Sequence, residues 1–190
     1  MEWKFILQIV GIVLGLLYLW LEYKADIRLW IVGLIMPVVH GILYFKSGLY
    51  ADCSMQLYYV LAGLYGLTVW HRSSKPAVDE KVLKIGHTPL KAVPVLLLAY
   101  AVVQTAIYLI LKNFTDSTVP FWDSLTTALC VIAYWMLSRK YIEQWLVWLV
   151  VDAVTVGLYI YKGIPLTAGL YVVYCVLAVA GYRKWLKMAR

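Results

Sequence analysis

Charged residues are scarce in this chain: they make up 14% of its 190 residues, and only ten residues are acidic. Hydrophobic residues take their place and reach 64%, whereas soluble domains contain about 45–50%. A soluble fold of this length cannot bury so much apolar surface, and a disordered chain needs the opposite composition. The composition therefore excludes a disordered chain, argues against a soluble enzyme and indicates a protein with several membrane spans.

Motifs of metal binding, nucleotide hydrolysis and catalysis are also missing. The three cysteines, Cys53, Cys130 and Cys175, form no C-x-x-C pair, and no histidine stands at metal-ligand spacing from them. We expect them to be buried thiols. The chain has no G-x-x-x-x-G-K-[ST] loop for ATP phosphates, and no Ser-His-Asp, H-E-x-x-H or clustered-carboxylate pattern. The sequence thus predicts no metal, no cofactor and no enzymatic activity.

What the chain does contain is a series of apolar runs, and a helix across a membrane takes about 17–25 residues. These runs must be helical because backbone groups in lipid have to bond within their own segment. The first run lacks a small-residue cleavage site, so we expect it to be a retained span. The seven predicted spans, of which the fifth is the shortest, are Trp3–Leu21, Leu29–Phe45, Ser54–Trp70, Ala92–Leu111, Ser124–Ser138, Gln144–Tyr161 and Leu166–Trp185.

Lysine and arginine fall mainly on one side of the membrane. Thirteen of the 17 lie in the first, third and fifth loops and the C-terminal tail, against four in the N-terminus and the other loops. Cytoplasmic loops carry an excess of Lys and Arg, so we expect the N-terminus outside and the C-terminus in the cytoplasm. The net charge of +7 then sets the topology, and nucleic acid is not an expected partner.

The chain also resembles itself. A shift of 115 residues aligns positions 20–70 with positions 135–185 without a gap, and twelve of the 51 pairs are identical. Matches of tryptophan and glycine are hard to obtain by chance, so the alignment predicts a duplication. The tryptophan and glycine pairs are Trp20/Trp135, Trp30/Trp145, Trp70/Trp185, Gly48/Gly163 and Gly66/Gly181.

The duplication predicts the architecture. The first three spans repeat as the last three, and the single span between them gives both triplets the same orientation. We therefore expect an all-α membrane protein of seven transmembrane helices in a 3+1+3 parallel internal repeat. Residues 1–70 would form the first three-helix bundle, 71–123 a cytoplasmic linker, the fourth helix and an outer loop, and 124–190 the second bundle. Parallel repeats of this kind are a transporter design, with the substrate near the midplane between the halves.

Asp152 is the clearest functional candidate. It stands eight residues into the sixth span, where an acidic residue costs about 2.5–3.5 kcal/mol on insertion. At helical spacing it shares a face with Trp148, Thr155 and Tyr159. A structural hydrogen bond to a neighbouring hydroxyl or to His40 is the alternative role for this carboxyl group.

The same face of the second span differs at its middle, where Pro37 aligns with Asp152 and His40 with Thr155. A symmetric scaffold with an asymmetric middle suits an asymmetric ligand. Aromatic side chains beside acids and hydroxyls suit a flat cationic ring, since cation–π attraction contributes about 0.5–2 kcal/mol. For Gln56 and Tyr59, helix packing explains their positions equally well. For Asp123, the alternative role is to cap the fifth helix. The ten candidate substrate-binding residues are Trp122, Asp152, Gln56, Tyr59, His40, Tyr44, Asp123, Trp148, Tyr171 and Tyr174.

Several local motifs resemble the Pnu family of vitamin transporters. They are Gly48-Leu49-Tyr50-Ala51-Asp52 with Gln56-Leu57-Tyr58-Tyr59 and Tyr65-Gly66, Pro120-Phe121-Trp122-Asp123-Ser124, Arg139-Lys140-Tyr141-Ile142-Glu143 with Trp145, and Gly181-Tyr182-Arg183-Lys184-Trp185. The resemblance covers nearly the whole chain. It implies a fold like a full-length SWEET transporter, often a homotrimer, in the bacterial inner membrane. It also implies facilitated diffusion of a B-group vitamin, which a cytoplasmic kinase traps by phosphorylation.

Two positions bear on which vitamin is carried. Members that carry nicotinamide riboside usually have Trp where this chain has Leu67, and tend to have Asn where it has Asp152. An acidic residue in the cavity favours a cation with hydrogen-bond donors, so the chain resembles most the thiamine (PnuT) type. We expect thiamine as the substrate, with nicotinamide riboside, itself a cation, as the alternative. A SWEET-type carrier of another solute and a receptor that binds without transport remain rival hypotheses.

The topology gives the first testable prediction. A reporter fused after Arg190 should be active only as a cytoplasmic reporter, because the lysine and arginine bias places the C-terminus inside. The measurement pairs a reporter that works in the cytoplasm with one that works outside it. Activity of the external reporter alone would contradict the predicted orientation.

Overall fold

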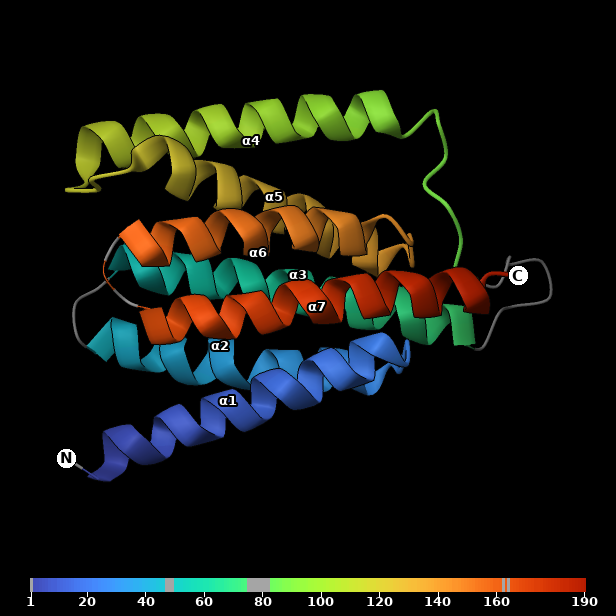
Figure 1. The fold of residues 1–190 in the computed structure, drawn as a ribbon, viewed down its shortest axis with the longest axis horizontal. Helices are drawn as coiled ribbons and strands as arrows, with labels where there is room; N and C mark the ends of the chain where they lie inside the picture. The colour runs from blue at the N-terminus through green and yellow to red at the C-terminus, as the bar shows by residue number, and fades with distance from the viewer. Residues whose placement is uncertain (1, 47–49, 75–82, 162, 164) are drawn as a thin grey trace. The chain divides into compact units, whose positions relative to one another are not determined.

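The structure is a computed structural model that describes residues 2–46, 50–74, 83–161, 163 and 165–190. Within these ranges the chain forms seven helices, and its one extended pairing is a bridge between Gly86 and Tyr141 (Figure 1). The helices are α1 (Glu2–Tyr23), α2 (Arg28–Lys46), α3 (Tyr50–Ser74), α4 (Val93–Phe114), α5 (Pro120–Ser138), α6 (Gln144–Tyr161) and α7 (Pro165–Met188).

Each helix coincides with one predicted span, and α6 has the predicted bounds at both ends. The largest difference at a start is in α5 and α3, which begin four residues earlier than predicted. In α5 the cause is local, because Pro120 occupies the first turn, where its missing N–H costs nothing. Among the described residues, α4 and α6 are long and apolar enough to cross a membrane by length and composition.

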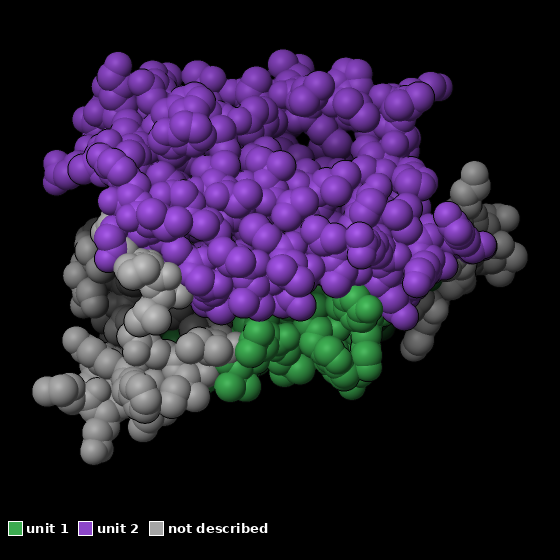
Figure 2. Space-filling model, viewed as in Figure 1, with its two compact units in different colours: residues 1–83 green, residues 84–190 purple. Residues whose placement is uncertain are grey.

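The chain divides into two compact units, which Figure 2 colours separately. Unit 1 is Met1–Leu83 and contains α1 to α3, with α2 packed against both other helices. Unit 2 is Lys84–Arg190 and contains α4 to α7. In unit 2 each helix packs against the next along the chain, and α6 with α7 forms its most extensive helix pair. The predicted division into three segments stays a prediction.

The corner between the first two helices of each predicted repeat has the same backbone structure in both units. Ala25, after α1, has φ +51°, and Lys140, after α5, has φ +56°. The N–H groups of Ala25 and Asp26 donate to carbonyls three and five residues earlier, both over 2.9 Å. Lys140 and Tyr141 repeat this pattern at 2.9 and 3.0 Å. Both helices therefore end in a Schellman motif with a left-handed residue, 115 positions apart.

The buried centre of each unit is also built alike, from a pair of edge-to-face tryptophans. Trp30 and Trp70 have ring centroids 5.8 Å apart at 83°, and Trp145 and Trp185 lie 5.9 Å apart at 85°. All four rings are buried. These tryptophans join the second and third helices of each triplet, and each pair stands at positions that the 115-residue shift aligns.

A glycine on the facing helix makes room for each inner tryptophan. A Cβ atom at Gly181 in α7 would lie 2.6 Å from the Trp145 ring. Gly181→Ala should therefore lower the free energy of unfolding by about 1–3 kcal/mol through overpacking. Thermal unfolding of the purified protein in detergent measures the effect.

Gly169→Ala is the matched control in the same helix, because a Cβ atom there meets nothing within 4 Å. This change should leave the melting temperature unchanged or raise it slightly, since alanine favours helix. Equal melting temperatures for the two variants would show that the Trp145 ring yields, and would contradict the tight contact.

Candidate functional site

The interior face of α6 carries several of the buried polar residues of unit 2. Asp152 exposes only 7% of its surface, and Thr155 on the next turn is buried as well. The Thr155 hydroxyl donates to the Val151 carbonyl over 2.7 Å, so it is satisfied within the helix. Asp152 lies eight residues from the start of α6, which is about 12 Å along the helix axis. The carboxyl group therefore stands in the middle of the span.

Groups on two neighbouring helices surround Asp152. Cys130 of α5 and Tyr171, Tyr174 and Cys175 of α7 all lie within electrostatic range of its carboxyl group. Across the described part of the chain, Asp152 takes part in no hydrogen bond and no ion pair. A buried carboxyl group without a partner is costly, so this position favours a ligand that brings positive charge or strong donors.

Aromatic rings lie around the carboxyl group. Tyr159 of α6 and Tyr171 of α7 are stacked, with centroids 5.4 Å apart and planes at 21°. Tyr171 also meets Tyr174 edge to face at 5.4 Å, and Trp148 meets Tyr134 of α5 in the same way at 5.9 Å. Two predicted residues, Tyr171 and Tyr174, thus form a cluster with Asp152, and a third, Trp148, lies one turn before Asp152 on α6. Rings of this kind can hold a flat cation by stacking and cation–π attraction.

Sequence reasoning missed Tyr134, and it treated Cys130 only as a buried thiol. Both lie on one face of α5, one turn apart. Cys130 lies opposite Asp152 of α6, and Tyr134, one turn later on α5, lies opposite Trp148, one turn earlier on α6. The short connection between α5 and α6 forces antiparallel packing, so this register was the signal that could have found Tyr134.

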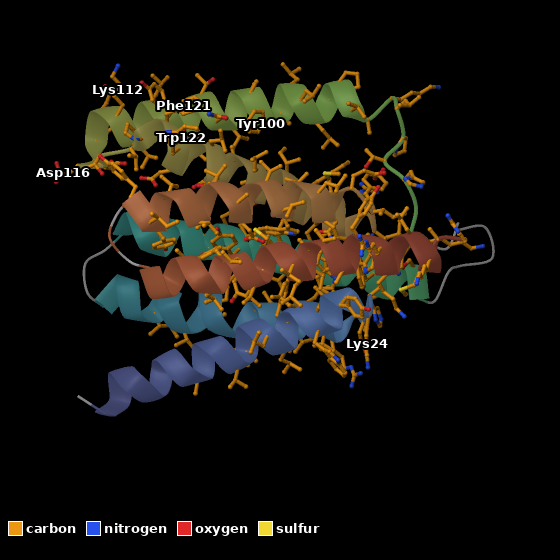
Figure 3. The ribbon with its side chains drawn as sticks, in the orientation of Figure 1. Lys24, Tyr100, Lys112, Asp116, Phe121 and Trp122 are labelled. Carbon is orange, nitrogen blue, oxygen red and sulfur yellow. The ribbon has the colours of Figure 1, made fainter. Side chains whose placement is uncertain are left out.

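Trp122 and Asp123 lie away from that cluster, at the start of α5. Figure 3 shows Trp122 beside Phe121 at the end of the unit that also carries Asp116. Trp122 exposes 47% of its surface, and it is eight residues from Cys130, about 12 Å along the axis. Asp123 accepts a hydrogen bond from the Ser117 hydroxyl over 2.7 Å. Their role in binding stays a prediction.

The cap that we considered for Asp123 is wrong. The residue before α5 is Val119, and the helix start has no side-chain cap. Asp123 lies inside the first turn, where its N–H donates to the Val119 carbonyl over 3.0 Å. The reason is that Pro120 begins the helix one turn's length before the predicted start.

The other four candidates belong to unit 1. Gln56 and Tyr59 are half-buried on α3, and Tyr59 meets Tyr58 edge to face at 5.5 Å. A Cβ atom at Gly41 of α2 would lie 3.5 Å from that of Gln56, so Gln56 sits against α2. The side chains of His40 and Tyr44 lie outside the described residues, and so does the alternative bond from His40 to Asp152.

A second polar arrangement fixes the start of α6. The Ile142 N–H donates to the Gly86 carbonyl over 3.0 Å, and the Gly86 N–H donates to the Lys140 carbonyl over 3.2 Å. Glu143 adds side-chain bonds: it accepts from the Thr88 hydroxyl at 2.7 Å and from the Thr88 N–H at 2.8 Å. The segment before α4 is thereby attached to the loop between α5 and α6.

The second oxygen of the Glu143 carboxyl group lies 2.7 Å from Nδ1 of His87. Partial burial alone would raise the pKa of Glu143, but the hydrogen bonds from Thr88 and His87 outweigh burial and lower it. A lowered pKa means that the ionised carboxylate is the form that holds this segment.

The chain is similar to known transporters. Residues 5–187 match the family model described as nicotinamide mononucleotide transporter. The nicotinamide riboside transporter PnuC of Escherichia coli (strain K12) is 27% identical over 208 residues, which cover 97% of this chain and 86% of that protein. The riboflavin/roseoflavin transporter RibM of Streptomyces davaonensis is 28% identical, over 94% of this chain and 83% of that protein.

A solved structure is similar as well. The crystal structure of the vitamin B3 transporter PnuC matches with a TM-score of 0.69 and 25% identity. The match covers 93% of this chain and 79% of that chain. The likeness therefore extends over both units rather than over one bundle.

The bonds of Glu143 give a prediction of pH-dependent stability. Glu143→Gln should lower the free energy of unfolding at pH 7 by about 1–2 kcal/mol, since it weakens hydrogen bonds to a charged group. Because the folded state lowers the pKa of Glu143, its contribution is present above the unfolded pKa of about 4.3 and is lost as the pH falls through the folded value.

Thermal unfolding from pH 7 down to pH 3 measures this prediction. The gap between wild type and Glu143→Gln should close at the acid end. Asp116→Asn is the control, because it removes an acidic group from an exposed loop position and should leave stability unchanged. A gap of constant size at every pH would contradict the role of the ionised carboxylate.

Proposed function

We propose that this chain, which belongs to the family of nicotinamide mononucleotide transporters, is a membrane transporter that carries nicotinamide riboside into the cell. Its relatives in Escherichia coli and Streptomyces davaonensis are named for nicotinamide riboside and for riboflavin. The similar solved structure is named for vitamin B3. Thiamine, the main expectation from the sequence, therefore gives way to nicotinamide riboside, its alternative.

The observation that carries the proposal is the environment of Asp152. The residue is only 7% exposed, and its carboxyl group has no hydrogen-bond or ion-pair partner in the described ranges. The pyridinium ring of nicotinamide riboside is a flat permanent cation, so it supplies the missing charge and can stack on Tyr171 and Tyr174. From the sequence alone, we propose that Gln56 and His40 would hydrogen-bond with its carboxamide and ribose hydroxyls. Riboflavin is neutral and leaves Asp152 without a counter-charge.

The duplicated scaffold supports transport by alternating access. Both units share the left-handed corner residue, the tryptophan pair and the glycine beneath it, at positions 115 apart. In our proposal the two triplets are parallel repeats in a full-length SWEET-like arrangement, and rocking of one against the other opens the site to each side in turn. His40, Tyr44, Trp122 and Asp123 would complete the site from their own helices.

The remaining parts of the proposal come from the charge bias and from the family resemblance. The protein would lie in the bacterial inner membrane with its N-terminus outside. It would work as a homotrimer by facilitated diffusion, and a cytoplasmic kinase would trap the vitamin by phosphorylation.

Asp152→Asn tests the binding site. The change keeps the size of the side chain and removes its charge, so binding of nicotinamide riboside should weaken about 10- to 100-fold, the range for a lost charge-assisted interaction. Calorimetric titration of the purified protein in detergent measures the affinity, with thiamine and riboflavin titrated in parallel.

Asp116→Asn makes the same chemical change at an exposed position and should bind as the wild type does. An unchanged affinity in Asp152→Asn would contradict the role of the carboxyl group. Tight binding of thiamine alone by the wild type would instead overturn the proposed substrate.

A further inference from the structure

A buried amide at the start of α6 has no assigned role. Gln144 is the first residue of α6, and none of its surface is exposed. Within the part of the chain that the structure describes, neither its Nε2 nor its Oε1 has a hydrogen-bond partner. Burying an amide in this way costs stability. The amide therefore either only destabilises the fold or has a function that offsets this cost.

Gln144 stands in line with two other polar groups that have no hydrogen-bond partner among the described residues. Trp148 follows one turn later, and its Nε1 is likewise buried with no partner among the described residues. Asp152 follows after one more turn. Because residues four apart share one face of a helix, these groups form a row from the start of α6 to the middle of the span. We call this row the polar row of α6.

The polar row faces α5. Asp152 is within range of Cys130, and Trp148 meets the ring of Tyr134. Continuing that antiparallel register by one turn sets Gln144 level with Ser138. The Ser138 hydroxyl donates to the Trp135 carbonyl over 2.6 Å. The row thus runs between two helices of unit 2 towards the end of α6 that the charge bias assigns to the cytoplasm.

Unit 1 shows that the fold does not require the amide. The shift of 115 residues aligns Gln144 with Leu29, which is also fully buried. The backbone is the same at both positions: the Leu29 N–H donates to the Asp26 carbonyl over 3.0 Å, and the Gln144 N–H donates to the Tyr141 carbonyl over 3.3 Å. Gly33 and Pro37 replace the other two members of the row. An apolar side chain therefore fits this corner.

We propose that Gln144 contacts the substrate on the cytoplasmic half of the pathway, in a state of the transport cycle in which the start of α6 is uncovered. The inference rests on the proposed function and deepens it. A glutamine amide offers one acceptor and two donors. It therefore matches the carboxamide or a ribose hydroxyl of a nucleoside that has left Asp152.

The test uses Gln144→Met and Gln144→Leu in the full chain. Met keeps the volume and the unbranched chain and removes only the amide, and Leu is the residue that unit 1 has at this corner. The control is Leu29→Met, which makes a volume-conserving change at the aligned position of unit 1. Each variant is measured for uptake of nicotinamide riboside into vesicles, for equilibrium affinity and for melting temperature.

Both Gln144 variants should take up nicotinamide riboside about two- to tenfold more slowly, which is the range for one lost hydrogen bond. Their melting temperatures should be equal to or above that of the wild type, and their affinity should stay close to it because Asp152 is intact. Leu29→Met should change neither uptake nor affinity. Wild-type rates in both Gln144 variants would overturn the proposal.

A melting temperature that falls together with uptake would also overturn it, since the amide would then be structural. Wild-type uptake tests the proposed function separately from Gln144. If the wild type carries thiamine or riboflavin but not nicotinamide riboside, the proposed substrate fails, and the ratio of variant to wild-type rates is measured with the carried compound.

Discussion

A carboxyl group inside a membrane span needs a positive charge or hydrogen-bond donors beside it. In this protein Asp152 is that carboxyl group. The residue is in the middle of α6 and is almost fully buried, and the described part of the chain offers it no ion-pair or hydrogen-bond partner. Thr155, one turn away, satisfies its own hydroxyl on the helix backbone. The nearby tyrosines supply ring faces rather than positive charge. In the proposed function, a cationic ligand provides the positive charge that Asp152 lacks.

A second constraint is the local structure that the two units have in common. Both units build the same corner, with a left-handed residue and the same pattern of backbone bonds, and the same tryptophan pair over a glycine. On that shared frame, α6 carries polar groups where α2 carries Leu29, Gly33 and Pro37. The corner of unit 2 is also attached to the segment before α4 through Glu143.

Much of the fold followed from the sequence because hydropathy decides where a membrane helix begins and ends. All seven helices lie where the apolar runs predicted them, and the shift of 115 residues aligned Trp145 and Trp185 with the buried pair of unit 1. Asp152 stood out because an acid in a span is rare. The start of α5 was harder to predict, since Pro120 rather than Ser124 begins the helix.

The surroundings of Asp152 were only partly predictable. Helical spacing gave Trp148 as its neighbour, but Tyr134 depends on the register between two helices, which a one-dimensional pattern does not show. The comparisons favour nicotinamide riboside over thiamine, and the sequence led to the opposite preference for a related reason. Thiamine and nicotinamide riboside are both flat cations, so the charge of Asp152 cannot separate them, and Leu67 was given too much weight.

Uptake by the purified chain in sealed vesicles tests the central claim most directly. Vesicles that contain the protein, with no ion gradient and no ATP, are given labelled nicotinamide riboside or labelled thiamine. The account predicts that nicotinamide riboside enters until its inside and outside concentrations are equal, and that Asp152→Asn slows this entry. Entry of thiamine alone, or no entry of either compound into vesicles that hold folded protein, would contradict it.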